Sequence, residues 1–190
     1  MKRIALLTVI ACLLAAPATL LAQTENHVEL GVFGDYFRYD QSGTINFVGL
    51  GGRAGFYVNP VTSIEAEMAY DFARNNTVIT GSGASTNFAT TRLRPLTGLF
   101  GPKFNLGTHA ANLFVTGKVG FVNFANSGQS FAQAVGNVED GTTRFAVYPG
   151  VGLEGFWGPF GLRAEVGDRI FFRDGARNNL TVTFGPHFRF

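Results

Sequence analysis

The 190-residue sequence is almost free of cysteine and carries few charges. Its single cysteine, Cys12, lies near the N-terminus, so the rest of the chain has neither a disulfide framework nor a cysteine-based metal site. Charged residues make up 15% of the chain, and the formal net charge of +2 comes from Lys2 and Arg3. The remainder has no net charge, which excludes the basic surface typical of nucleic-acid binding.

Long apolar runs are also missing after residue 22, and helical periodicity is scarce there. These features exclude membrane-spanning helices in that part of the chain. The 25 Gly residues follow no triplet period and Pro is limited to 7, so a collagen-like chain is excluded as well. A hydrophobic content of 46%, including 20 Phe, can bury a core. We therefore expect one ordered domain over residues 23–190.

The first 22 residues have the pattern of a secretory signal peptide. Two basic residues precede an apolar stretch at residues 4–14, and small residues follow it. We expect cleavage after Ala22, with Ala18 as the alternative site. A membrane-anchoring helix is disfavoured because Pro17 interrupts the run. A lipoprotein signal at Cys12 is disfavoured because the apolar run continues past that cysteine.

From about residue 28 onward, apolar and polar residues alternate with a period of two, which is typical of β-strands. In the last segment, Leu180, Val182 and Phe184 lie on one face, whereas Thr181 and Thr183 lie on the other. The pattern predicts eight strands, at about residues 28–38, 46–58, 63–72, 92–106, 112–124, 144–156, 160–172 and 180–190. Short connections alternate with longer polar ones, so we predict an all-β fold, an eight-stranded antiparallel up-and-down barrel.

The polarity of the two faces favours a membrane barrel, in which the apolar face is outside. Most strand glycines share the polar face, and they suit the narrow interior of an eight-stranded barrel better than a solvated surface. A Lys or Arg facing lipid at mid-bilayer would cost about 2–4 kcal/mol, and the apolar face has neither at the strand centres. We therefore predict a transmembrane β-barrel with a lumen charge network formed by Glu29, Arg53, Glu65, Glu67, Lys103, Lys118, Glu154, Arg163, Glu165 and Arg169.

The C-terminal residues form a motif with a polar residue, a glycine and two aromatics at fixed spacing: Thr183, Gly185, Phe188 and Phe190. This motif resembles the C-terminal β-signal of bacterial outer-membrane barrels. Over about residues 27–190 the chain is similar to the small eight-stranded outer-membrane β-barrel superfamily, which includes the OmpA transmembrane domain and OmpX-like proteins. The resemblance implies export to the outer membrane of a Gram-negative-type envelope, insertion by the barrel assembly machinery, and contact with outer-membrane lipid and lipopolysaccharide.

Two short turns predict specific cross-strand pairs in the lumen. A hairpin centred on Pro60 places Arg53 opposite Glu67, and a turn at Gly158 and Pro159 places Glu154 opposite Arg163. We expect both pairs to be ion pairs.

Enzymatic motifs of the HExxH, Walker A, CxxC and GxSxG types are absent from the sequence. Glu65 and Glu67 share a face, as glycosidase carboxylates do, but salt bridges in a narrow lumen are the simpler explanation. An even number of strands places His27, His109 and His187 at the periplasmic end. The family resemblance implies that lipid-modifying barrels keep their catalytic histidine toward the outer leaflet, so these positions disfavour such an enzyme.

His27, Glu29 and His187 would converge where the first and last strands pair. A metal site is one interpretation of that convergence, but we expect lumen histidines that are simply hydrogen-bonded. The sequence thus predicts no catalytic residue, no cofactor and no metal.

The function that we expect is structural, with surface interaction such as adhesion through extracellular loops at residues 73–91 and 123–143. In this interpretation the charged residues plug the lumen. A narrow pore for small solutes or ions is the alternative, and conductance in planar bilayers would separate the two. A lipid-modifying barrel enzyme and a soluble lipocalin-like carrier are less favoured.

Overall fold

The computed structural model describes residues 27–40, 44–80, 87–107, 111–128, 143–172 and 175–190. The strands are β1 (Val28–Asp40), β2 (Thr44–Asn59), β3 (Thr62–Asp71), β4 (Arg74–Thr80), β5 (Asn87–Asn105), β6 (Ala111–Gly128), β7 (Thr143–Trp157), β8 (Phe160–Asp168), β9 (Ile170–Phe172), β10 (Ala176–Arg177) and β11 (Leu180–Arg189). Within these ranges, no helix is long and apolar enough to span a membrane. The predicted signal peptide and the Ala22 cleavage site lie outside the described residues.

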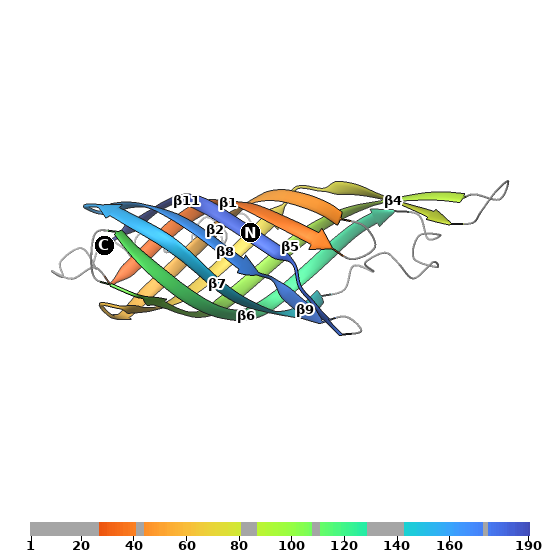
Figure 1. The fold of residues 1–190 in the computed structure, drawn as a ribbon. Helices are drawn as coiled ribbons and strands as arrows, with labels where there is room; N and C mark the ends of the chain where they lie inside the picture. The colour runs from red at the N-terminus through yellow and green to blue at the C-terminus, as the bar shows by residue number, and fades with distance from the viewer. Residues whose placement is uncertain (1–26, 41–43, 81–86, 108–110, 129–142, 173–174) are drawn as a thin grey trace, which may run out of the picture.

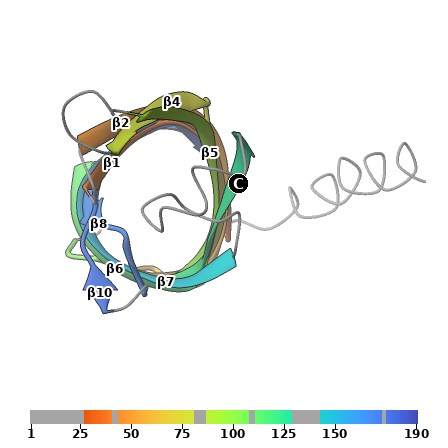
Figure 2. The same cartoon turned by 90° about the vertical axis from the view of Figure 1, so that its right-hand side faces the viewer.

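Eight of the strands close into one antiparallel barrel (Figures 1 and 2). The wall runs through β1, β2, β3, β5, β6, β7, β8 and β11, and the pairing of β11 with both β1 and β8 closes the ring. Both described termini lie at the end of the short turns β2–β3 and β7–β8. The predicted fold class is confirmed.

Side chains alternate between the lumen and the outer surface along each wall strand. In β1, for example, Glu29 and Phe33 are 1% and 4% exposed, whereas Leu30 and Val32 are 41% and 63% exposed. The exposed side chains in the middle of the strands are apolar, which suits contact with lipid. The barrel is therefore polar inside and apolar outside.

The region predicted as a loop at residues 73–91 contains a β-hairpin instead. β4 pairs with the first part of β5, from Arg74 opposite Leu93 to Thr80 opposite Asn87. β-branched residues such as Val78 and Ile79 favour this extended pairing. The hairpin projects beyond the barrel wall (Figure 1). In the other predicted loop, 123–143, β6 continues to Gly128, and residues 129–142 lie outside the described residues.

The predicted strand at residues 160–172 is divided at Arg169 into β8 and β9. β9 continues the register of β8 on β7, since Gly167 lies opposite Gly150 and Phe171 lies opposite Ala146. The backbone N–H of Arg169 donates to the carbonyl of Asn179 at 2.8 Å, and beyond it β10 pairs with β9 in the register that β11 has with β8.

Candidate functional site

The inward-facing charged residues of the barrel contact one another across the lumen. Nine of the ten residues predicted to line it are 6% exposed or less, and the side chain of Glu67 is 7% exposed. Ten residues from all eight wall strands form the lower network, toward the short turns: Glu29, Arg53, Glu65, Glu67, Lys103, Lys118, Glu154, Arg163, Glu165 and His187. It holds five carboxylates and four Lys or Arg side chains.

In the part of the lower network nearest the chain termini, the contacts converge on the ammonium group of Lys103. Its Nζ lies 2.8 Å from Glu154, 3.1 Å from Glu29 and 3.3 Å from Glu65. It also donates to the hydroxyl of Tyr57 at 3.2 Å, and that hydroxyl donates to Glu29 at 2.9 Å. All five side chains come from different strands, so this centre ties the wall together across the lumen.

Arg163 makes the shortest contacts of the network. Its guanidinium donates to both carboxylate oxygens of Glu65, at 2.6 and 3.0 Å, and to Glu165 at 2.6 Å. A bidentate guanidinium–carboxylate pair is among the stronger polar contacts in proteins. Arg163 thus connects β8 to β3 through the interior.

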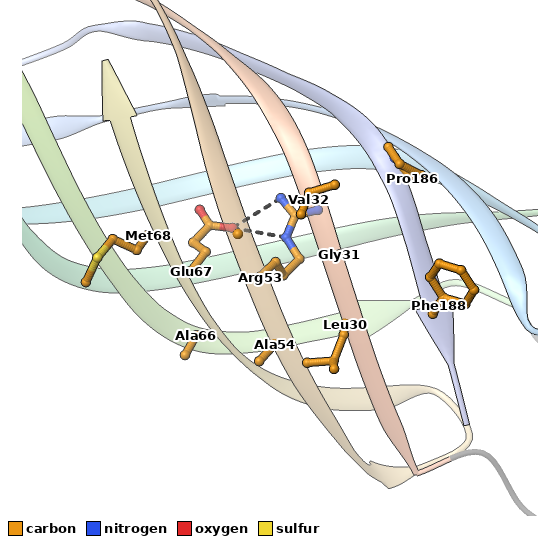
Figure 3. Close-up of a pocket in the computed structure, with 11 residues that line it drawn as sticks. Leu30, Gly31, Val32, Arg53, Ala54, Ala66, Glu67, Met68, Pro186 and Phe188 are labelled. Carbon is orange, nitrogen blue, oxygen red and sulfur yellow. Dashed lines mark hydrogen bonds and ion pairs between the residues drawn. The ribbon is translucent and has the colours of Figure 1, made fainter. Parts of the chain in front are cut away.

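Arg53 and Lys118 complete the network in the middle of the barrel. Arg53 Nε donates to Glu67 at 3.2 Å (Figure 3). Its Nη2 lies 3.3 Å from Glu165. Lys118 Nζ lies 2.8 Å from Glu67 and 3.2 Å from Glu165. Glu67 therefore has two cationic partners, and Glu165 has three when Arg163 is included.

Both predicted cross-strand registers are confirmed, since Arg53 lies opposite Glu67 and Glu154 lies opposite Arg163. The first pair is an ion pair, as expected. The second expectation is wrong, because Glu154 binds Lys103 while Arg163 turns to Glu65 and Glu165. Long side chains in a narrow lumen reach partners across the barrel as readily as their ladder neighbours.

A second cluster lies nearer the β4–β5 hairpin and is built around Gly49. Asp35 and Asp71 flank this glycine on the neighbouring strands. A Cβ at Gly49 would meet Asp71 Oδ1 at 2.6 Å, so only glycine leaves room for the carboxylate. Arg169, from the β8–β9 break, donates to Asp35 at 2.9 Å and lies 3.6 Å from Asp71. Neither oxygen of Asp71 has a hydrogen-bond partner among the described residues.

An aromatic cluster fills the lumen beyond Arg169, toward the hairpin end. Its rings are Phe37 and Tyr39 of β1, Phe47 of β2, Phe124 of β6 and Phe171 of β9, each 3% exposed or less. Tyr39 stacks on Phe171 at 6.0 Å between ring centroids. Tyr39 and Phe171 lie near strand ends, where a membrane barrel carries its interfacial girdle of aromatic side chains, but the alternation points both of them into the lumen. The rings pack against one another at this end of the lumen.

The girdle itself is formed by other aromatic side chains at the strand ends. Tyr70 and Phe72 lie outside at one end, and Trp157 and Phe160 lie outside at the other, with exposed fractions of 42–69%. Aromatic side chains at these positions mark the two interfaces of a membrane barrel.

The two described histidines lie at the end of the barrel where the chain termini are, in different environments. His187 is buried, with its Nδ1 2.7 Å from Glu29, whereas His27 stacks on Phe56. His109 lies outside the described residues. Ligand atoms of Glu29, Glu154 and His187 lie within 4.8 Å of one another. The Lys103 ammonium already contacts both carboxylates, so a metal would have to displace it.

The predicted β-signal residues lie on β11, which pairs with β1 to close the barrel. Thr183 faces the lumen and Phe188 faces outward, at 3% and 41% exposure. Phe190 exchanges backbone hydrogen bonds with Val28. A Cβ at Gly185 would collide with the backbone of β1, so this glycine also permits the close pairing at the seam.

A hollow of about 570 Å³ lies in the outer wall over β1, β2, β3 and β11 (Figure 3). Gly52, Ala54 and Ala66 line it among larger apolar side chains. The hollow lies on the outer, apolar face of the wall.

The β4–β5 hairpin carries exposed arginines where it leaves the wall. Arg92 and Arg94 of β5 are exposed on the outer face, because Leu93 between them is buried in the lumen. Asn75 of β4 lies opposite Arg92, and the guanidinium of Arg94 lies over the ring of Tyr70 at 5.5 Å. Neither arginine has an acidic partner among the described residues.

Comparisons with known proteins agree with this architecture. The profile of the outer membrane protein beta-barrel domain matches residues 4–188. No curated protein sequence matches the chain. Among solved structures, Neisserial surface protein A is similar with a TM-score of 0.59 at 9% identity, over 86% of this chain and 97% of that one.

Two further solved barrels share the fold. The Yersinia pestis attachment invasion locus protein Ail, in complex with the heparin analogue sucrose octasulfate, has a TM-score of 0.53 at 14% identity, over 87% of this chain and 97% of that one. The Escherichia coli outer membrane protein W has a TM-score of 0.52 at 14% identity, over 88% and 100%. The chain therefore belongs to the outer membrane protein β-barrel family and is a protein of the outer membrane.

Proposed function

We propose that this protein is a non-enzymatic surface-interaction protein whose lumen is plugged and whose extracellular hairpin binds acidic groups of surface glycans. The observation that carries the proposal is the projecting β4–β5 hairpin with unpaired arginines at its base. The phosphate groups of lipopolysaccharide and the sulfate groups of host polysaccharides share the required chemistry.

The plugged lumen supports this function over transport. The lower ion network fills the barrel toward the short turns, and the aromatic cluster fills it toward the hairpin. Eight strands leave an interior just wide enough for side chains. With both halves occupied, the exposed segments are where partners have access.

The hairpin extends from the end that we assign to the extracellular side, since outer-membrane barrels have short turns in the periplasm and longer loops outside. Seven residues of β4 pair with β5, which corresponds to about 24 Å of strand. The arginines lie at the base of this hairpin, beside the outward-facing Tyr70 and Phe72, which places them at the level of the headgroups, where anionic groups are found.

Guanidinium groups recognise phosphate and sulfate through paired hydrogen bonds, and Arg92 and Arg94 are two residues apart on one face. The exposed Arg74 begins the neighbouring strand. Ail, a barrel of the same fold, has been solved with a sulfated heparin analogue. That complex motivates a sulfated probe.

The test measures binding of the refolded protein to immobilised heparin over a series of NaCl concentrations. We expect Arg92→Gln with Arg94→Gln to weaken binding by about tenfold or more, because a hydrogen bond to a charged group contributes about 1.5–3 kcal/mol. Arg38→Gln is the matched control, since Arg38 is exposed at the same end but has Asp40 at 3.9 Å. Equal binding by the double variant and the wild type would contradict the proposal.

Two further measurements separate the sources of the ligand and the alternative functions. Binding to vesicles with and without lipopolysaccharide, compared between the wild type and the double variant, tests whether the same arginines bind lipid phosphates. Planar-bilayer recordings test the plug, because discrete conductance steps would favour the narrow pore instead. An altered lipopolysaccharide mass spectrum in cells with the protein would indicate an enzyme.

A further inference from the structure

The end of the β4–β5 hairpin is a two-stranded ribbon that stands beyond the barrel wall (Figure 1). Here we call residues 77–80 of β4, together with residues 87–90 of β5 that pair with them, the tip. Within the part of the chain that the structure describes, β4 pairs only with β5, and β6 pairs with β5 no further than Thr91. Among these strands, both outer edges of the tip therefore carry backbone N–H and C=O groups that no neighbouring strand pairs.

β2 reaches only the base of β4. The backbone N–H of Phe72, which precedes β4, donates to the carbonyl of Val48 on β2 at 2.9 Å. β2 begins at Thr44, four residues before Val48, and the partners of an antiparallel pair advance together along the two chains. Four residues after Phe72 is Asn76, so β2 lies beside β4 no further than that residue. The β4 edge of the tip therefore stands directly above the start of β2.

The sequence of this edge favours pairing with another strand. Residues 77–80 are Thr, Val, Ile and Thr, all β-branched, and residues 75–80 contain neither a charge nor a proline. Proteins commonly protect an edge strand with charged side chains or proline. A two-stranded ribbon alone is marginally stable in water, and a third strand is normally needed for independent stability. The tip therefore has an edge that accepts another strand, and it gains stability when one pairs with it.

The barrel beneath the edge limits which strand can pair there. A second copy in the same membrane presents its β4 in the same direction, so pairing would place its barrel where β2 and β1 stand. A copy in a facing membrane presents the same edge in the opposite direction, with its own barrel beyond the tip. Antiparallel pairing of two β4 edges about a two-fold axis is therefore open to copies in facing membranes.

We propose that the β4 edges of two copies in facing membranes pair as antiparallel strands, so that the protein attaches one outer membrane to another. The two tips then form a four-stranded sheet with the two β4 strands at its centre. Residues 77–80 carry no charge, so identical edges do not repel each other. Because the strands are antiparallel, the arginines at the two hairpin bases lie at opposite ends of this sheet. The proposal goes beyond glycan binding at the hairpin base and does not depend on it.

The test measures the association of phospholipid vesicles that contain the refolded protein, by two-colour fluorescence. Wild-type vesicles should associate with one another and should not recruit protein-free vesicles. Val78→Lys should reduce association by about tenfold or more, because Val78 is in the middle of the edge and the two introduced charges lie close to the two-fold axis. Val78→Glu should act in the same direction. Vesicles with Val78→Lys mixed with vesicles with Val78→Glu should associate again, because opposite charges then meet at the axis.

Ala89→Lys is the matched control. Ala89 lies opposite Val78 on the same hairpin, so this variant adds the same charge at the same height, but one strand further from the partner copy. It should reduce association much less than Val78→Lys does. Heat-dependent migration on SDS gels checks that the barrel of each variant is folded, and both substitutions lie outside the barrel wall.

Three results would overturn the proposal. Wild-type vesicles that stay dispersed would mean that the edge does not pair with its own copy, and equal recruitment of protein-free vesicles would mean that the tip binds lipid. Equal losses for Ala89→Lys and Val78→Lys, or continued dispersal of the mixed Lys and Glu vesicles, would exclude pairing through β4. Val78→Lys should still bind heparin, and Arg92→Gln with Arg94→Gln should still associate, so the failure of one proposal is distinguishable from the failure of the other.

Discussion

Replacing Lys103 by Met should destabilise the barrel far more than replacing its partner Glu154. The Lys103 ammonium is fully buried and lies within 3.3 Å of Glu154, Glu29 and Glu65. The lower network holds one more carboxylate than it holds Lys and Arg side chains. Removing Lys103 leaves five carboxylates facing three cations, whereas removing Glu154 leaves four of each. The two partners of a single ion pair thus have opposite effects on the charge balance.

The burial of these side chains determines how much each substitution should lower the free energy of unfolding. Removing one partner from a buried network typically costs about 3–5 kcal/mol, because the remaining charges are desolvated and uncompensated. For a chain of this size, that loss corresponds to a fall in the unfolding temperature of about 6–20 °C. Glu154→Met should change stability by about 1 kcal/mol at most, since Lys103 keeps Glu29 and Glu65. The double variant should recover part of the loss seen with Lys103→Met alone, because it restores the original excess of one carboxylate.

The assay is the temperature at which the folded band is lost on SDS gels, with samples heated before electrophoresis. Comparable losses for the two single variants would refute the charge-balance argument. Additive losses in the double variant would show that the pair is uncoupled, and a hydrated lumen would then describe the interior better.

Two other substitutions test the predicted β-signal at the C-terminus and the packing of side chains in the lumen. Phe190→Ser should reduce the amount of barrel in the outer membrane much more than Phe72→Ser. Both variants lose an interfacial aromatic side chain, but only Phe190 belongs to the predicted β-signal. Equal losses of barrel in the two variants would argue against that signal. Gly161→Val should destabilise the barrel by about 1–3 kcal/mol, because its side chain would overlap the ring of His187. The lipid-facing Gly52→Val, which has open space, should be nearly neutral on the same heated gels.

Alternation along the strands made the inside and outside of the barrel predictable. Glu29, Glu65 and Glu154 lie at positions of the polar face, and the period of two fixes that face once the strand is identified. The two hairpin registers were predictable for the same reason, because a tight turn determines which residues lie opposite each other.

The partners within the lumen were not predictable from spacing. Arg163 and Glu65 are 98 residues apart in the sequence, and Lys103 of β5 reaches Glu154 of β7 past the intervening strand β6. Long side chains have several rotatable bonds, so backbone register limits their partners only weakly. The closed barrel, rather than any local pattern, decides which charges meet.

The residues that occupy the lumen toward the β4–β5 hairpin were not predicted, because they are apolar or lie between strands. Phe37 and Phe47 occupy inward positions, and their parity alone would have placed them inside. Asn179, which bonds both the N–H and the carbonyl of Arg169, lies between two strands, and no motif in the sequence marks it.

The sequence separation of the lumen ion pairs also has a kinetic consequence. Arg53 and Glu165 are 112 residues apart, and Glu29 and His187 are 158 residues apart. Such contacts form only when the first and last strands meet, after the rest of the wall has assembled. Interactions made so late in assembly act mainly on the rate of unfolding. The network therefore sets how long a finished barrel survives in the membrane, while the speed of its insertion depends on the strands alone.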